Sequence, residues 1–194
     1  MAEPRRTRPR PLQCVAAAAV AAVVVIAIVV ILWLVLHPTK VRFSVDHAAA
    51  SGFNFTAAGA LTGAFDLTLR AYNLNSRASV SYRSLEVGVW YNGTYVAGAT
   101  APGFLQPPEN ETRVDVAAQA AAPEVLPRSV EEEMKRERTA RGRVTVDVHV
   151  VAKARFRYGV VATRRYKVRA SCPGVAVDFA APTTFHRVSC YVHI

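Results

Sequence analysis

Hydrophobic and polar residues divide the chain into two unlike parts. No residue from Leu12 to Leu36 is charged, and the run from Cys14 to Leu36 is apolar on every face of a helix. At about 1.5 Å per residue this run would extend roughly 34 Å, enough to cross a hydrocarbon core of about 30 Å. The pattern therefore predicts a transmembrane helix over Cys14 to Leu36.

A cleavable secretory signal is the alternative interpretation of this apolar run. Such a signal has an apolar core of about 7–15 residues, closely followed by small residues at the cleavage site. The core is longer here, and the small residues Ala48 to Ser51 come well after it. We therefore expect an uncleaved anchor.

The charges that flank the apolar run predict its orientation. Four arginines precede it, whereas only Lys40 and Arg42 follow closely. Positive charge is retained on the cytosolic side of a membrane, so the N-terminus is expected in the cytosol and the rest of the chain outside it.

Beyond the apolar run, hydrophobic and polar residues alternate with the period of two that is typical of half-buried strands. The apolar faces are formed by Phe65, Leu67, Leu69 and Ala71, by Leu85, Val87, Val89 and Tyr91, by Thr112, Val114 and Val116, by every second residue from Val144 to Tyr158, and by every second residue from Tyr166 to Cys172. Asn92-Gly93 predicts a two-residue hairpin turn. Short strands separated by Gly, Pro and Asn predict an all-β, antiparallel β-sandwich.

One segment departs from this alternation and predicts a single exposed helix inserted between strands. Ser129 followed by Glu132 has the spacing of a capping box. Acidic residues precede basic ones along the segment, which complements the helix dipole, and Gly142 is a typical C-terminal residue. The possible i,i+4 ion pairs are Glu131/Lys135, Glu132/Arg136 and Glu137/Arg141.

These patterns predict four parts along the chain. They are a basic cytosolic tail (1–13), the transmembrane helix (14–36), a juxtamembrane segment and linker (37–60), and a β-sandwich domain (61–194).

Positive charge is concentrated in one stretch of this chain, whose formal net charge is +10. The stretch has no acidic residue and holds Lys153, Arg155, Arg157, Arg164, Arg165, Lys167 and Arg169. An ordinary solvated face explains such a pattern, and so does a surface for an acidic partner. Outside the cytosol that partner would be an anionic lipid headgroup or an acidic cell-wall polysaccharide, not a nucleic acid.

Covalent modification is predicted at several residues. Three Asn-x-Thr sequons make Asn54, Asn92 and Asn110 candidate glycosylation sites. Cys172 and Cys190 are the two cysteines after the apolar run, and we expect them to form a disulfide in an oxidising compartment. Cys14, at the edge of the run, is a candidate for S-acylation.

No catalytic or metal-binding motif is recognisable, so the sequence predicts no enzyme, no cofactor and no metal. His186, Cys190 and His193 could be drawn with Cys172 as a metal cluster, but zinc ligands usually come in closely spaced pairs. The carboxylates of Asp147 and Asp178 have no neighbouring partner of the kind that acid–base catalysis needs.

Several short motifs resemble the plant family of harpin-induced and non-race-specific disease-resistance-like proteins, which have a group 2 late-embryogenesis-abundant (LEA-2) domain. They are Asn73-Leu74-Asn75, Tyr82, Tyr91-Asn92-Gly93, the loop from Pro102 to Pro107, Thr112 and Cys172. Leu74 departs from the family pattern, which has proline there, so Asn73 and Asn75 must hold the turn by their side chains alone.

The resemblance implies an immunoglobulin- or fibronectin-like β-sandwich with one helix. It also implies a single-pass plasma-membrane protein with an extracellular domain, and it allows a position at plasmodesmata. The implied role is a non-enzymatic tether or signalling component in plant defence and stress response, with protein partners in that signalling. The alternative is a lipid-binding or membrane-contact module that uses the sandwich core.

Overall fold

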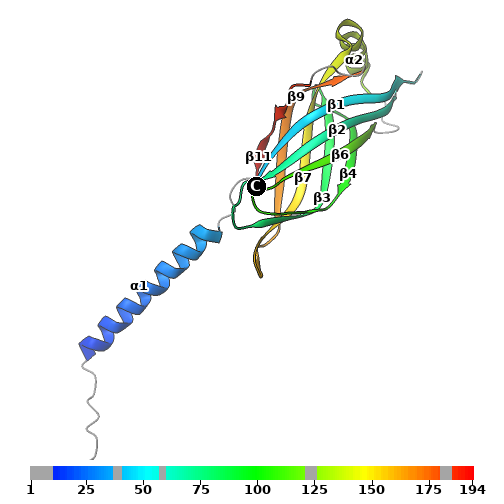
Figure 1. Cartoon of the computed structure of the whole chain (residues 1–194). Helices are drawn as coiled ribbons and strands as arrows, with labels where there is room; N and C mark the ends of the chain where they lie inside the picture. The colour runs from blue at the N-terminus through cyan, green and yellow to red at the C-terminus, as the bar shows by residue number, and fades with distance from the viewer. Residues whose placement is uncertain (1–10, 37–40, 57–59, 121–125, 180–184) are drawn as a thin grey trace, which may run out of the picture. The chain divides into compact units, whose positions relative to one another are not determined.

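A computed structural model describes residues 11–36, 41–56, 60–120, 126–179 and 185–194, and within the first range it describes the side chains of residues 15–31. The chain forms two compact units, Met1–His37 and Pro38–Ile194. The first contains the helix α1, and the second contains the strands and the helix α2 (Figure 1). The basic tail up to residue 10 and the side chain of Cys14 lie outside the described residues.

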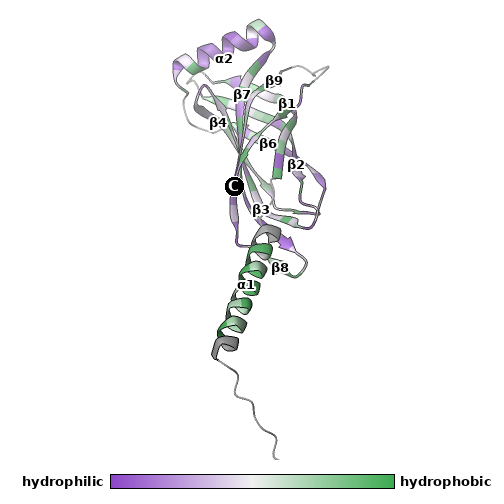
Figure 2. Ribbon diagram, turned by 90° about the vertical axis from the view of Figure 1, so that its left-hand side faces the viewer, coloured by the Kyte–Doolittle hydropathy of each residue, from purple (hydrophilic) through white to green (hydrophobic). Residues whose placement is uncertain are grey.

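The predicted membrane anchor is contradicted. The helix α1 spans Pro11–Leu36, and its described side chains are exposed. Its middle part is hydrophobic (Figure 2). Within the described part of the chain, no helix is long and apolar enough to cross a membrane. The transmembrane assignment of Cys14 to Leu36 is corrected accordingly, together with the single-pass topology, the cytosolic N-terminus and the extracellular plasma-membrane location inferred from it.

The second unit consists of strands and one helix. The helix α2 spans Arg128–Arg141. The strands that the structure describes are β1 (Val41–Phe55), β2 (Leu61–Asn73), β3 (Ser79–Tyr91), β4 (Thr94–Pro102), β5 (Leu105–Gln106), β6 (Glu111–Ala120), β7 (Arg143–Tyr158), β8 (Val161–Ala162), β9 (Tyr166–Asp178), β10 (Val188–Ser189) and β11 (Tyr191–His193). The strand β1 lies within the stretch 37–60 that the sequence assigns to a linker.

These strands form one sheet that closes on itself. The hydrogen-bonded order is β10-β1-β2-β6-β4-β3-β7-β9-β11, with antiparallel neighbours. The strands β1 and β9 also pair with each other in parallel, at Ala49 and Asp178, so β1, β2, β6, β4, β3, β7 and β9 form a ring. The prediction of an all-β fold agrees with this structure, but the prediction of two packed sheets, an immunoglobulin- or fibronectin-like sandwich, is wrong.

The closure has a physical reason in the long, irregular strands. Register shifts interrupt the β1–β2 ladder between Val45 and His47 and the β3–β7 ladder between Tyr82 and Leu85. Bulges of this kind bend a strand and increase its twist, which brings the two edges of one sheet together. Alternation in the sequence predicts that one face is buried. The alternation does not show whether the buried face packs against a second sheet or against the opposite wall of the same closed sheet.

The core lies inside the closed sheet, and the alternating apolar positions predicted from the sequence point into it. Phe65, Phe156, Leu69 and Leu85 are among its largest fully buried side chains. The helix α2 packs against this core with Val130 and Met134, and Met134 is fully buried. The predicted inserted helix is therefore present, but one of its faces is covered.

The ends of α2 agree only partly with the prediction. Gly142 ends the helix with a left-handed φ of 66°, as predicted, and its N–H donates to the carbonyl of Arg138. The prediction of a capping box from Ser129 to Glu132 is wrong, because Pro127 is the N-cap residue and no side chain makes a capping hydrogen bond. The backbone N–H of Val130 donates instead to the Pro127 carbonyl at 2.9 Å.

The predicted hairpin at Asn92-Gly93 is confirmed. Tyr91 pairs with Thr94 across a two-residue turn, and both turn residues have positive φ, 45° and 75°. Asparagine and glycine adopt such angles more readily than other residues, which is why this dipeptide predicts the turn.

Candidate functional site

Seven basic residues are predicted from the sequence to contact an acidic partner, and five of them lie on one outer surface of the sheet. We call this surface, formed by Lys153, Arg155 and Arg157 of β7 with Lys167 and Arg169 of β9, the basic face. All five side chains are exposed, and they alternate with buried residues that point into the core. Because β7 and β9 are antiparallel neighbours, residues far apart in the sequence meet here.

The other two predicted basic residues border this face. Arg164 and Arg165 are exposed in the connection between β8 and β9, and the Arg164 guanidinium lies 5.3 Å from the centre of the Tyr166 ring. On the neighbouring strand β3, Ser79 is opposite Arg157 and Ser81 is opposite Arg155, which adds hydroxyl groups to the rim.

Like charges are opposed on the basic face. Lys153 is the direct ladder partner of Lys167, and residues so paired have Cβ atoms about 4.5–5.5 Å apart. Directly opposed like charges destabilise a sheet, so the arrangement has a cost that a bound anion would offset.

The basic face also lacks internal neutralisation. Among the residues that the structure describes, no carboxylate lies within 4 Å of its five cations. Elsewhere on the same sheet, Arg113 pairs with Asp115, Arg143 with Asp178, and Arg187 with Asp46. Cations that are concentrated and unneutralised attract anions, so this surface is suited to an acidic ligand.

The structure joins Cys172 and Cys190 in a disulfide with an S–S distance of 2.04 Å. Cys190 lies between β10, which pairs with β1, and β11, which pairs with β9. Its backbone N–H donates to the carbonyl of Phe43 at 3.0 Å. The C-terminal segment thereby spans the seam between β1 and β9.

All three sequon asparagines are exposed, as a glycan acceptor must be. The side-chain nitrogen of Asn92 donates to the Glu133 carboxylate of α2 at 2.8 Å. The side chain of Asn54 accepts a hydrogen bond from the Phe55 N–H. Glycosylation at these residues stays a prediction.

In the described part of the chain, no three His, Cys, Asp or Glu side chains are grouped so that they could hold a metal ion. The thiols of Cys172 and Cys190 are joined to each other. Asp147 accepts a hydrogen bond from the Gly174 N–H, and Asp178 pairs with Arg143 at 3.4 Å. His149 is exposed, as the alternation on its strand predicts.

Two of the motifs behind the family resemblance, Asn73-Leu74-Asn75 and the loop from Pro102 to Pro107, meet in a buried hydrogen-bond network. The side-chain nitrogen of Asn73 donates to the carbonyls of Ala78 and Pro107, each at 2.8 Å. Its side-chain oxygen accepts from the backbone and side-chain nitrogens of Asn75. The Gln106 side chain is fully buried and donates to the Ala71 carbonyl at 2.7 Å. These residues hold loops together, so their role in the structure is architectural.

A buried tyrosine links α2 to the sheet and gives a pH-dependent prediction. The Tyr91 hydroxyl donates to the Glu137 carboxylate at 3.2 Å. Burial raises the pKa of Tyr91 to about 12, and the negative charge of Glu137 adds to the effect. Because the folded state favours the neutral phenol, stability is fully present below pH ~10 and falls as the pH rises from about 10 to about 12.

We therefore expect the Tyr91→Phe variant to lose less stability than the wild type across this pH window. Urea unfolding at several pH values between about 9 and 12 measures the difference, with Tyr191→Phe, an exposed tyrosine, as the control. Parallel pH profiles of the wild type and Tyr91→Phe would contradict the expectation. Burial also raises the pKa values of Tyr82 and Tyr158, so part of the decline remains in every variant.

Comparison with known proteins agrees with the sequence motifs. The model of the LEA_2 family, described as late embryogenesis abundant protein, matches residues 68–172. NDR1/HIN1-like protein 12 of Arabidopsis thaliana is 34% identical over 70 residues, which cover 36% of this chain and 33% of that protein. NDR1/HIN1-like protein 6 of the same plant is 27% identical over 153 residues, which cover 77% and 59%. The chain thus spans less than two thirds of either relative.

Among solved structures, the solution structure of an Arabidopsis thaliana protein covers 75% of this chain and 85% of its own, with 15% identity and a TM-score of 0.39. This similarity is too distant to identify a shared fold. The family model, in contrast, extends from β2 to β9 and matches more than half of the 194 residues. The protein therefore belongs to the LEA-2 family, as an NDR1/HIN1-like member of it.

Proposed function

We propose that the protein is a non-enzymatic binding protein and that its basic face binds an acidic polysaccharide. Its family membership relates it to plant stress and defence. A domain that holds a polymer on one face and leaves other faces free for a protein partner can serve as a tether or a signalling component in that response.

The unneutralised basic face is the observation that carries this proposal. The opposed Lys153 and Lys167 and the absence of a carboxylate within 4 Å of the face, among described residues, favour a ligand that supplies the missing negative charge. An ordinary solvated face has no need of such a concentration, and three other arginines of the same sheet, Arg70, Arg113 and Arg143, are paired with acids.

The spacing of the cations favours a polymer over a single small anion. Lys153, Arg155 and Arg157 occupy every second position of β7 and are all exposed. Outward side chains that are two residues apart on a strand lie about 6.5–7 Å from each other. A row of evenly spaced cations suits a chain with a carboxylate on each sugar, such as a polyuronate.

The direct test measures binding of the full chain to polygalacturonate, by calorimetry, at several salt concentrations. Electrostatic binding weakens as salt rises, because exposed charges are screened beyond about 8–10 Å near physiological ionic strength. Replacing Lys153, Arg155, Arg157 and Lys167 by Gln is expected to abolish binding. Folding stability should change by about 0.5 kcal/mol or less, since exposed charges contribute little to it.

A matched control separates a specific surface from net charge. Arg42, Arg77, Arg128 and Arg136 are exposed and lie outside the basic face, so their fourfold Gln variant loses the same charge. It should bind polygalacturonate nearly as well as the wild type. Equal weakening in both fourfold variants, or binding that survives high salt, would contradict the proposal.

No observation favours the alternative function, a lipid held in the core. Interior positions of the closed sheet are filled by large side chains such as Phe65, Phe156, Leu69 and Met134, each less than 2% exposed. An apolar ligand would have to displace them, and displacing well-packed core residues is costly.

A further inference from the structure

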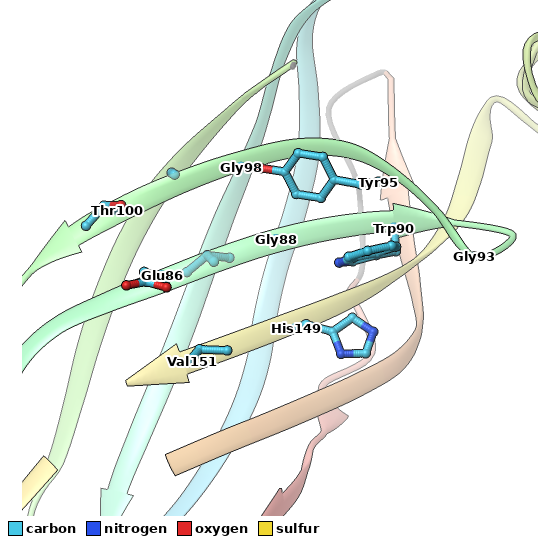
Figure 3. A pocket seen from close by; sticks show the side chains of 11 residues that line it. Glu86, Gly88, Trp90, Gly93, Tyr95, Gly98, Thr100, His149 and Val151 are labelled. Carbon is cyan, nitrogen blue, oxygen red and sulfur yellow. The ribbon is translucent and has the colours of Figure 1, made fainter. Parts of the chain in front are cut away.

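A groove with aromatic side chains lies on the outer face of β3, β4 and β7, next to the basic face, since its lining residue Val151 is the ladder partner of Arg169. Its volume is about 880 Å³, and Trp90, Tyr95 and His149 line it together with Glu86 and Thr100 (Figure 3). A volume of this order is typical of sites for small ligands. The proposed function does not account for it.

Two glycines make this groove possible. Gly88 of β3 and Gly98 of β4 are direct partners in the ladder, so neither strand has a side chain at this point of the outer face. A Cβ atom at Gly98 would lie 1.9 Å from the Tyr95 hydroxyl oxygen, and one at Gly88 would lie 3.2 Å from the Trp90 indole nitrogen. The two rings therefore occupy the space that side chains would otherwise fill.

The rings form a corner and not a flat stack. The ring centres of Trp90 and Tyr95 are 5.4 Å apart with an angle of 68° between the planes, and those of Trp90 and His149 are 5.9 Å apart at 75°. Figure 3 shows Trp90 edge-on, between the more open faces of Tyr95 and His149. Tyr95 is 37% exposed, so part of its ring is accessible to a ligand.

The polar groups of the groove indicate an uncharged ligand that is rich in hydroxyl groups. The lining residues include one carboxylate, Glu86, and neither lysine nor arginine. The carboxylate accepts hydrogen bonds and repels anions, while the Thr100 hydroxyl and the His149 imidazole both donate and accept. An acidic sugar is thus disfavoured beside Glu86, in contrast to the basic face.

We propose that this groove binds an uncharged hexose unit of a glycan. One face of a hexose ring presents C–H groups, which pack against an aromatic ring, and its edge carries hydroxyl groups, which reach the polar residues of the groove. The corner of Tyr95 and Trp90 offers an apolar floor and wall, and Glu86, Thr100 and His149 lie at its edge. This inference does not depend on the proposed function of the basic face.

A proline-rich peptide is the other ligand class that aromatic grooves accept. Its prolines have no N–H or O–H groups to donate to Glu86, whereas a sugar has hydroxyl groups that can. The observations therefore favour the sugar, and the peptide serves as one arm of the test.

The test titrates the full chain with hexaoses of glucose, mannose and galactose, with decaproline, and with trigalacturonate, using saturation-transfer NMR and calorimetry. We expect at least one neutral hexaose to bind and its ring protons to receive saturation. Tyr95→Ala and Trp90→Ala should each weaken that binding about tenfold, the effect of losing roughly one aromatic contact.

Gly98→Ala tests the geometry specifically, because the new methyl group would displace the Tyr95 ring without removing it. It should weaken hexaose binding like Tyr95→Ala. Tyr191→Ala, which removes a 70% exposed tyrosine outside the groove, should bind like the wild type. The fourfold Gln variant of the basic face should also bind normally, which separates the two proposals.

Failure of all three neutral hexaoses to bind would overturn the inference. So would preferential binding of decaproline or trigalacturonate at the groove, or hexaose binding that Tyr95→Ala leaves unchanged.

Discussion

Replacing Asn73 by alanine is expected to lower the free energy of unfolding by about 3–5 kcal/mol. The side chain is 2% exposed and makes four hydrogen bonds, two to the carbonyls of Ala78 and Pro107 and two from Asn75. A hydrogen bond contributes about 1 kcal/mol net, but a buried group that loses its partner costs about 1–3 kcal/mol. Alanine removes the partner of several such groups at once.

Urea unfolding of the wild type and Asn73→Ala at pH 7 measures this effect. Asn54→Ala provides the control, since Asn54 is exposed and its side chain accepts one hydrogen bond from the adjacent Phe55 N–H. We expect the control to change stability by about 0.5 kcal/mol or less. A loss below about 1 kcal/mol in Asn73→Ala would show that the network contributes much less than its burial implies.

Sequence reasoning predicted this turn because its information is local. With leucine at position 74 in place of proline, the two flanking asparagines were expected to hold the chain by their side chains. The structure confirms this for Asn73 and Asn75, while Leu74 is 45% exposed and leaves the turn to them. The Asn92-Gly93 hairpin was predictable for the same reason, since two residues determine its geometry.

The closure of the sheet was not predictable, because it depends on pairing between distant strands. In β1 every second residue from Val41 to Val45 is apolar and buried. The register shift after Val45 moves the next buried apolar residue to Ala48, which breaks this alternation. A pattern so interrupted resembles a linker, which is why the strand was missed. The parallel pairing of Ala49 with Asp178 joins opposite ends of the domain sequence, and no local pattern signals it.

The two candidate sites also differ in how far the sequence predicts them. The cations of β7 share one side of a strand, so alternation alone predicted that they would lie together, although not that Lys153 would be opposite Lys167. The aromatic groove was missed because Trp90 and Tyr95 lie on either side of a turn. Its available signal was a glycine inside each of two strand patterns, Gly88 and Gly98, which often marks a close approach of other atoms.

The C-terminal segment gives the second large expected effect, because the proposed disulfide links its two short ladders covalently to β9. The strands β10 and β11 are two and three residues long, and they pair with β1 and β9 on either side of Cys190. Cys172 and Cys190 are 18 residues apart, and a bridge that closes a loop of this length contributes about 3 kcal/mol through the entropy of the unfolded chain. Without the bridge, these short ladders are expected to open more readily than the long ladders of the sheet.

Non-reducing peptide mapping should therefore recover Cys172 and Cys190 in one linked peptide, and reduction should lower the free energy of unfolding by about 3 kcal/mol. Comparing oxidised and reduced wild type avoids the cavity that substitution of the buried Cys172 would create. Cys14→Ser, measured in parallel, shows whether the third cysteine contributes to the effect of the reductant.

Hydrogen exchange should show where stability is lost on reduction. The amides of Tyr191 to His193 are expected to lose their protection. Amides in the middle of β7 are expected to stay protected, because the ladders of β7 to β3 and β9 do not involve the bridge. Free thiols in the untreated protein, or equal protection of the C-terminal amides before and after reduction, would contradict the role of the bridge in closing the seam between β1 and β9.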